Sequence, residues 1–171
     1  MDDHRDRIQQ LSIAACVALF ESYGLDMRHV AQIVPSACDM LYCGIVGFSG
    51  RDIRGGLVLA GSREALGASN PVETAGIRDW VAELANQLAG RIKSRLLAHD
   101  VELQIATPVV LRGEHLSLEA RGPVTPQWFQ SSRSSERVCL WMDIELGPTF
   151  TMSETPDASK AGLDEGTSLM F

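Results

Sequence analysis

The sequence has 171 residues, of which 45% are hydrophobic and 22% are charged. These proportions are typical of a globular domain, and the length is sufficient to bury a substantial core. The formal net charge of −7 offers no basic footprint for nucleic acids or anionic membranes, so neither is expected as a partner. No apolar run approaches the roughly 20 residues that span a bilayer. No secretory signal is recognisable either, and we therefore expect a cytoplasmic protein.

The four cysteines are expected to be small buried hydrophobic residues in a reducing compartment. They are Cys16, Cys38, Cys43 and Cys139. None of them forms a Cys-x-x-Cys pair, and no histidine lies at a zinc-site spacing from them. The sequence therefore predicts no metal site in this chain.

The predicted elements begin with a helix over residues 5–23, where apolar residues recur at helical spacing and Gly24 is a natural C-terminal stop. Residues 27–35 are expected to form a strand or a helical turn. Two strands follow, at residues 40–48 and 56–59, with a hairpin connection over 49–52. Their glycines favour bulges or close packing against a helix. A short helix is expected at 63–68.

The most strongly patterned segment is a predicted helix over residues 74–97, which would be about 35 Å long, with Thr74 as its candidate N-cap. Strands are expected after it at 101–110, 116–120 and 137–145, and a polar turn at 130–136. Pro108 should bend the first of these strands or place it at an edge. Polar residues dominate from Gly147 onward. We therefore expect a domain over 1–146 and a mobile or loosely docked tail over 147–171.

This order of elements predicts an α+β fold, in which an antiparallel sheet packs with two main long helices. Helix followed by strands occurs twice, which hints at an internal duplication. The last strand alternates apolar and polar residues but places Trp141 on its second face. This placement indicates that the second face is also covered, either by a helix or by another subunit.

The long helix separates into two faces at about 100° per residue. Its apolar stripe comprises Ile77, Val81, Leu84, Ala85, Leu88, Ile92 and Leu96. On the opposite side, spacings of four, three and four align Asp79, Glu83, Asn86 and Gly90. Glu83 and Asn86 therefore project side by side from the outer face.

Two residues of this outer face are unusual inside a helix. Asparagine competes for backbone hydrogen bonds, and Gly90 costs about 1 kcal/mol relative to alanine. A glycine also removes side-chain bulk, so that another backbone can approach. Two interpretations follow from the pattern. Either the face is a docking site, or Asn86 is a tolerated surface residue and Gly90 packs against a neighbouring element.

The stretch from Asp79 to Gly90, Asp-Trp-Val-Ala-Glu-Leu-Ala-Asn-Gln-Leu-Ala-Gly, resembles the signature helix of the CheC/CheX/FliY phosphatases of bacterial chemotaxis. In that family an acid, two residues and an asparagine precede a glycine four residues on. The Pro-x-x-x-x-Gly pattern from Pro108 to Gly113 resembles the strand and turn that follow there. The similarity spans roughly residues 5–145. A single such helix in a chain of this length resembles CheX rather than CheC. Arg91 departs from the family, which often has a small or amide residue there.

The resemblance implies a CheX-like homodimer joined through its sheets that hydrolyses the aspartyl phosphate of a CheY-like response regulator. Asn86 would position the attacking water, and Glu83 would contact a lysine of the partner. Asp79, Gln87 and Gly90 would belong to the partner-binding surface. No cofactor is expected in this chain, because Mg²⁺ would be held by the partner's receiver domain.

Two other functions remain open from the sequence. The chain could be a non-catalytic, CheC-like binding module or adaptor that holds a receiver domain through the same fold. It could instead be an α+β domain that binds a small molecule in a deep apolar pocket. The aromatic residues available to line such a pocket are Trp80, Trp128, Phe129 and Trp141, although such residues more often belong to a core or an interface.

Overall fold

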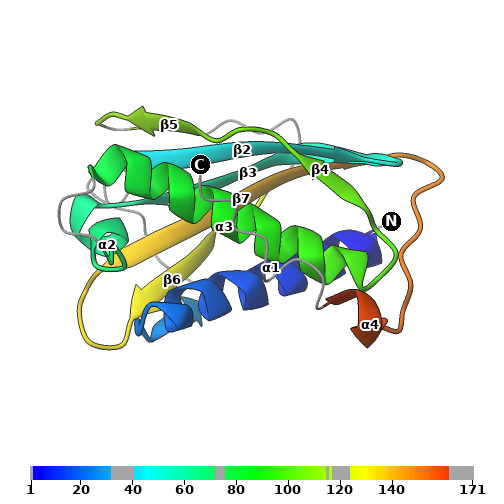
Figure 1. Cartoon of the computed structure of the whole chain (residues 1–171), viewed down its shortest axis with the longest axis horizontal. Helices are drawn as coiled ribbons and strands as arrows, with labels where there is room; N and C mark the ends of the chain where they lie inside the picture. Colours follow the sequence, from blue (N-terminus) through cyan, green and yellow to red (C-terminus); the bar gives the residue numbers. More distant parts are fainter. Residues whose placement is uncertain (1, 32–40, 72–75, 115, 117–123, 162–171) are drawn as a thin grey trace.

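The computed structural model describes residues 2–31, 41–71, 76–114, 116 and 124–161 (Figure 1). A long helix followed by a run of strands occurs twice along this part of the chain. Their order is α1 (Asp2–Ser22), β1 (Met27–Val30), β2 (Tyr42–Gly50), β3 (Ile53–Gly61), α2 (Arg63–Gly67), α3 (Ile77–Leu97), β4 (Leu103–Ile105), β5 (Val109–Arg112), β6 (Gln127–Ser131), β7 (Arg137–Leu146) and α4 (Ala158–Ala161).

The seven strands form one antiparallel sheet in the order β1-β6-β7-β3-β2-β4, with β5 also paired to β2. The predicted strand at 101–110 is in fact two short strands. Of these, β4 pairs with residues 48–50 and β5 with residues 42–45 of β2. The break between them contains Pro108, which has no amide hydrogen to donate to a ladder. The predicted α+β fold with an antiparallel sheet and two long helices is confirmed.

Both long helices cover the same face of the sheet (Figure 1). They converge at the end that holds the N-terminus of α1 and the C-terminus of α3, and they diverge toward the other end. The main core lies between them and the sheet. It contains the predicted apolar stripe of α3, of which Val81, Leu84, Ala85 and Leu88 are fully inaccessible to solvent.

Helix α3 lies unusually close to the sheet at Gly44 of β2. A Cβ atom at this position would lie 2.7 Å from the Cβ of Ala85 and 3.0 Å from the backbone oxygen of Val81. Both distances are shorter than normal van der Waals contacts, so only a glycine fits here. The predicted close packing of a glycine-containing strand against a helix is therefore present at Gly44.

Three local expectations need correction or fall outside the described residues. Helix α3 begins at Ile77 with Gly76 as its N-cap and no side-chain cap hydrogen bond, whereas Thr74 lies outside the described part. Strand β6 was not expected from the sequence, and its last two residues, 130 and 131, lie in the predicted polar turn. It forms because it pairs with both β1 and β7. Residues 117–120 of the strand expected at 116–120 also lie outside the described part.

The second face of the sheet carries a smaller apolar cluster of its own. Its buried members are Cys43, Val58, Ala60, Trp128, Cys139 and Trp141. Leu116 and Val124, from the connection between β5 and β6, pack against this cluster. The cover that Trp141 requires therefore comes at least partly from the same chain.

The segment after β7 is docked as far as it is described, in contrast to the expected loose tail. Phe150 and Met152 are buried in the main core. The Ser153 amide donates to the carbonyl of His99 (2.9 Å), and the Asp157 amide donates to that of Ala98 (2.7 Å). These bonds fasten the segment to the C-terminal end of α3. Residues 162–171 lie outside the described part.

No helix in the described part of the chain has the length and apolar character that crossing a lipid bilayer requires.

Helix α1 ends in a left-handed glycine, as its sequence predicted. Gly24 has φ of +74°, and the amide of Leu25 returns to the carbonyl of Phe20 at 3.0 Å. We expect Gly24→Ala to lower the free energy of unfolding by about 1–2 kcal/mol, because a Cβ disfavours this conformation. Urea denaturation measures the change.

Gly24→Asn is the matched control, since asparagine tolerates the left-handed region better than alanine. It should cost clearly less than Gly24→Ala. Equal losses for the two variants would show that backbone conformation is not the reason for the glycine.

Candidate functional site

The outer face of α3 presents the predicted site residues to solvent. Asp79, Glu83 and Asn86 are exposed, and Gln87 and Gly90 are half-buried. Residues on the opposite side of the same turns are buried against β2 and α1. The structure thus brings together all five residues on one helix, in the order that the spacing predicted.

Asn86 lies on this face with its amide available. Within the described part of the chain, its side chain makes no hydrogen bond to another residue. An amide offers both an acceptor and two donors. Asn86 can therefore hold a water molecule or a polar group of a partner.

Glu83, by contrast, is already held within the chain. Its Oε1 accepts a hydrogen bond of 2.7 Å from Nε2 of Gln87, one turn further along α3. The amide oxygen of Gln87 in turn accepts a hydrogen bond of 2.8 Å from the hydroxyl of Tyr23. Tyr23 follows the last residue of α1, so the carboxylate of Glu83 is linked to a second helix.

Gly90 leaves open space on the outer face. A Cβ atom built on it would meet no described atom within 4 Å. Among the described residues, therefore, no neighbouring element packs against the site of a Cβ at Gly90. Exposure of Asn86 and the bare surface at Gly90 together favour the docking interpretation.

Arg91 departs from the family pattern and has an internal role. Its guanidinium donates to the hydroxyl of Ser22 at 3.2 Å, so it joins the end of α1 to α3. It lies next to Gly90 in sequence, and its side chain is half-buried. The bond to Ser22 draws this cation toward α1.

The cysteines and other potential metal ligands do not form a further site in the described residues. No group of three or more His, Cys, Asp or Glu side chains is placed there to hold a metal ion. Burial raises the pKa of the Cys43 thiol to about 11. Burial, and to a smaller extent the charge of the nearby Cys43, raises the pKa of the Cys139 thiol to about 12. Both thiols therefore stay protonated at neutral pH, as the interpretation as buried hydrophobic residues requires.

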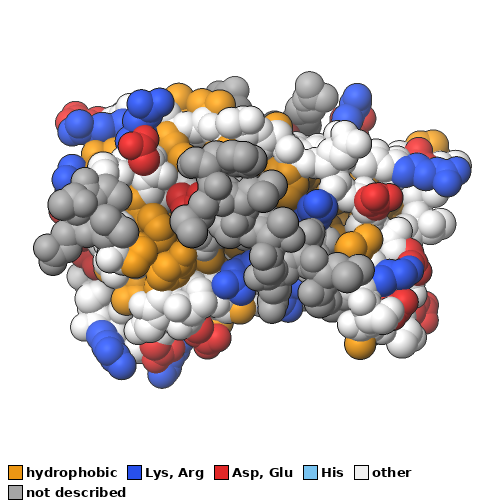
Figure 2. Space-filling view, in the orientation of Figure 1, with side chains coloured by type: hydrophobic (Ala, Val, Ile, Leu, Met, Phe, Trp, Pro, Cys, Tyr) orange, Lys and Arg blue, Asp and Glu red, His pale blue; other side chains and the backbone are white. Residues whose placement is uncertain are grey.

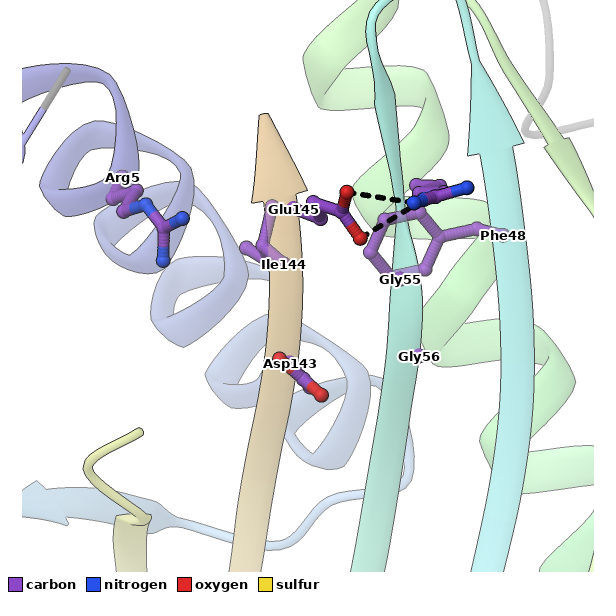
Figure 3. A pocket seen from close by; sticks show the side chains of 8 residues that line it. Arg5, Phe48, Gly55, Gly56, Asp143, Ile144 and Glu145 are labelled. Atoms are coloured by element: carbon purple, nitrogen blue, oxygen red, sulfur yellow. Dashed lines mark hydrogen bonds and ion pairs between the residues drawn. The ribbon is translucent and has the colours of Figure 1, made fainter. Parts of the chain in front are cut away.

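A hollow of about 720 Å³ lies away from α3. Figure 3 shows Arg5 of α1 together with residues of β2, β3 and β7 on its walls, and dashed lines join Arg54 to Glu145. These walls combine charged side chains from Arg5, Arg54, Asp143 and Glu145 with the apolar Phe48 and Ile144 and two glycines. None of the four aromatic residues proposed to line an apolar pocket contributes to it; all four are buried elsewhere in the two cores. This hollow is therefore not the aromatic-lined apolar pocket that the small-molecule interpretation expects.

The surface around α1 and α3 mixes charges of both signs (Figure 2). Basic and acidic side chains are interspersed around its rim, with an apolar patch toward the end where the helices diverge. Such a surface suits contact with another protein better than attraction of a uniformly charged polymer.

The family described as "Chemotaxis phosphatase CheX" matches residues 42–130, which is more than half of the chain and includes all five outer-face residues of α3. The chain belongs to the CheX family. The match does not include α1, so Tyr23 lies outside it. Comparison with curated proteins finds no match.

Solved structures of the CheX family share the fold. CheX from Vibrio vulnificus is 18% identical, with a TM-score of 0.67 over 81% of this chain and 96% of that one. CheX from Desulfovibrio desulfuricans is 17% identical, with a TM-score of 0.67 over 81% and 99%. A CheX–CheY–BeF₃–Mg²⁺ complex from Borrelia burgdorferi matches at 15% identity, with a TM-score of 0.59 over 80% and 96%. At these identities the likeness shows the fold.

Sequence reasoning found the outer face of α3 but missed Tyr23. The five predicted residues share one helix, so their spacing was sufficient to place them together. Tyr23 is 64 positions from Gln87, and no local pattern joins the two. Its place directly before the helix-ending Gly24 was the one available signal.

We expect Gly90→Ala to raise the free energy of unfolding by about 0.5–1 kcal/mol, since alanine favours the helix and its methyl group meets no described atom. Thermal or urea denaturation measures the change. Gly44→Ala is the matched control and should destabilise, because its methyl group would collide with Ala85. Loss of stability in Gly90→Ala would mean that another part of the chain packs on this face.

Proposed function

We propose that this chain is a phosphatase that hydrolyses the aspartyl phosphate of a CheY-like response regulator in the cytoplasm. The observation that carries the proposal is the pair Glu83 and Asn86, exposed three residues apart on α3 of a CheX-family fold. The family description supports this reaction, as does the neighbour in complex with CheY.

Asn86 is proposed to position the attacking water. Hydrolysis of a phosphoryl group requires a water in line with the breaking P–O bond and little covalent chemistry from the protein. The Asn86 amide can accept from this water and donate to the phosphoryl oxygens. Holding the water and the phosphoryl group in this geometry makes their bimolecular reaction effectively unimolecular. The Mg²⁺ ion is proposed to belong to the receiver domain.

Glu83 is proposed to fix the angle of approach through a lysine of the partner. A carboxylate and an ammonium form a short, charge-assisted hydrogen bond. Glu83 lies one turn before Asn86, so this contact would orient the asparagine on the phosphoryl group. Asp79 and Gly90, at the two ends of the same face, would complete the docking surface. Gln87 would support it from the side that faces α1.

We expect Asn86→Ala to lower the rate of phosphate release from a phosphorylated CheY-like receiver in Mg²⁺ by about 10²-fold, since the water loses its positioning group. Glu83→Ala should mainly raise KM, by about ten- to 100-fold, through loss of a charge-assisted contact of roughly 1.5–3 kcal/mol. Steady-state phosphate release measures both constants.

Arg133→Ala is the control, because Arg133 is exposed in the β6–β7 turn and belongs to no site described above. Its rate should equal that of the wild type. Binding of receiver domains without acceleration by the wild type would instead support the alternative function, a non-catalytic adaptor of the same fold.

We further propose that two copies of the chain associate through their sheets, as the family resemblance implies. Among the described residues, the exposed large hydrophobic side chains are Val109 (57% exposed) and Leu111 (46%), both on the edge strand β5. Replacing both by lysine should convert a dimer to a monomer, because a charged edge resists pairing. Analytical ultracentrifugation measures the mass. A wild-type protein that sediments as a monomer would contradict the proposal.

A further inference from the structure

We infer that Tyr23 is a positioning residue which, through Gln87, holds the Glu83 carboxylate ready for the partner. The inference rests on the proposed contact of Glu83 with a receiver domain and extends it to a second helix. Its geometric basis is the continuous chain of hydrogen bonds from the Tyr23 hydroxyl to Gln87 (2.8 Å) and from Gln87 to Glu83 (2.7 Å).

The chemistry of the three groups determines which group donates and which accepts in each of these two hydrogen bonds. An ionised carboxylate only accepts hydrogen bonds, so the amide nitrogen of Gln87 must face Glu83. The amide oxygen of Gln87 then faces Tyr23 and can only accept. The Tyr23 hydroxyl is therefore the donor, and each group has one orientation that satisfies the next.

Tyr23 is in turn held by packing and by the end of α1. Its ring meets that of Trp80 edge-on, with the centroids 5.2 Å apart and the planes at 87°. Trp80 is buried, and its indole nitrogen donates to the carbonyl of Leu66 and to the hydroxyl of Ser69, both at 3.1 Å. Residues of α1, α2 and α3 together thus determine where the Tyr23 hydroxyl lies.

Such support matters because Glu83 is exposed. A free glutamate samples several rotamers and must lose that freedom when it binds a partner. The hydrogen bond from Gln87 removes part of this freedom in advance. Gln87 is neutral, so it orients the carboxylate without cancelling the charge that a lysine would recognise. The bond occupies Oε1, which leaves Oε2 for the partner.

The bond from Gln87 alone would give weak support. Exposed side-chain pairs four residues apart on a helix stabilise only slightly, and the amide of a free glutamine rotates. The Tyr23 hydroxyl prevents this rotation from outside the helix. Tyr23, directly after α1, therefore takes part in recognition although it lies outside the segment matched by the CheX family.

The test is Tyr23→Phe, which removes the hydroxyl but keeps the ring against Trp80. We expect KM for the phosphorylated receiver to rise about three- to tenfold, with kcat and the melting temperature nearly unchanged. The same substitution in a Glu83→Ala background should have no further effect on KM. Tyr42→Phe, at the only other tyrosine of the chain, is the matched control and should leave KM unchanged.

A purely structural role of Tyr23 predicts other results. The melting temperature would then fall, and KM would rise equally with and without Glu83. An additive effect on KM in the double variant overturns the inference, and so does an unchanged KM in Tyr23→Phe. In either case, phosphate release by the wild type would still support the proposed phosphatase.

Two readouts separate the inference from the proposed reaction. The first is affinity for a CheY-like receiver loaded with Mg²⁺ and beryllofluoride, which requires no hydrolysis. Coupling between Tyr23 and Glu83 in affinity, without turnover by the wild type, would reject the phosphatase and keep the inference.

The second readout is NMR of the Gln87 side-chain amide without any partner. Its resonances should shift in Tyr23→Phe, and unchanged resonances would overturn the inference.

Discussion

The contact between α3 and β2 at Gly44 determines how the rest of the molecule is arranged. No side chain separates the strand from the helix there, so the backbone of α3 lies directly over the sheet. This contact fixes the rotation of α3 about its axis, with Val81 and Ala85 pointing inward. Helix geometry then requires Glu83 and Asn86 to point outward. The orientation of the candidate site is thus a consequence of core packing.

The elements that could be predicted from the sequence are those whose signal is local. The periodicity of both long helices and the alternation of β7 lie within single segments, and the structure confirms them. The signal was insufficient where long-range pairing decides the structure. Strand β6 has five residues and exists through its two neighbours. Phe150 and Met152 are isolated apolar residues in a polar segment, and only the finished core shows where they are buried.

The same distinction applies to the candidate site. Glu83, Asn86 and Gly90 share one helix, so their spacing alone predicted a common face, and the structure shows that face to be exposed. The hydrogen bond from Tyr23 to Gln87 depends on how α1 and α3 pack, and on the left-handed Gly24 that ends α1. No pattern in a single sequence specifies such a contact. It became visible only once the two helices were placed on the sheet.

The division of α3 into two faces has a consequence for how the protein can evolve. Substitutions on the outer face leave the core untouched, so the proposed preference for a response regulator can drift or be reselected without loss of the fold. Gln87 is the exception, because its amide faces both Glu83 and α1. Lineages that change position 87 are therefore expected to change position 23 as well, and this pair would record the history of partner choice.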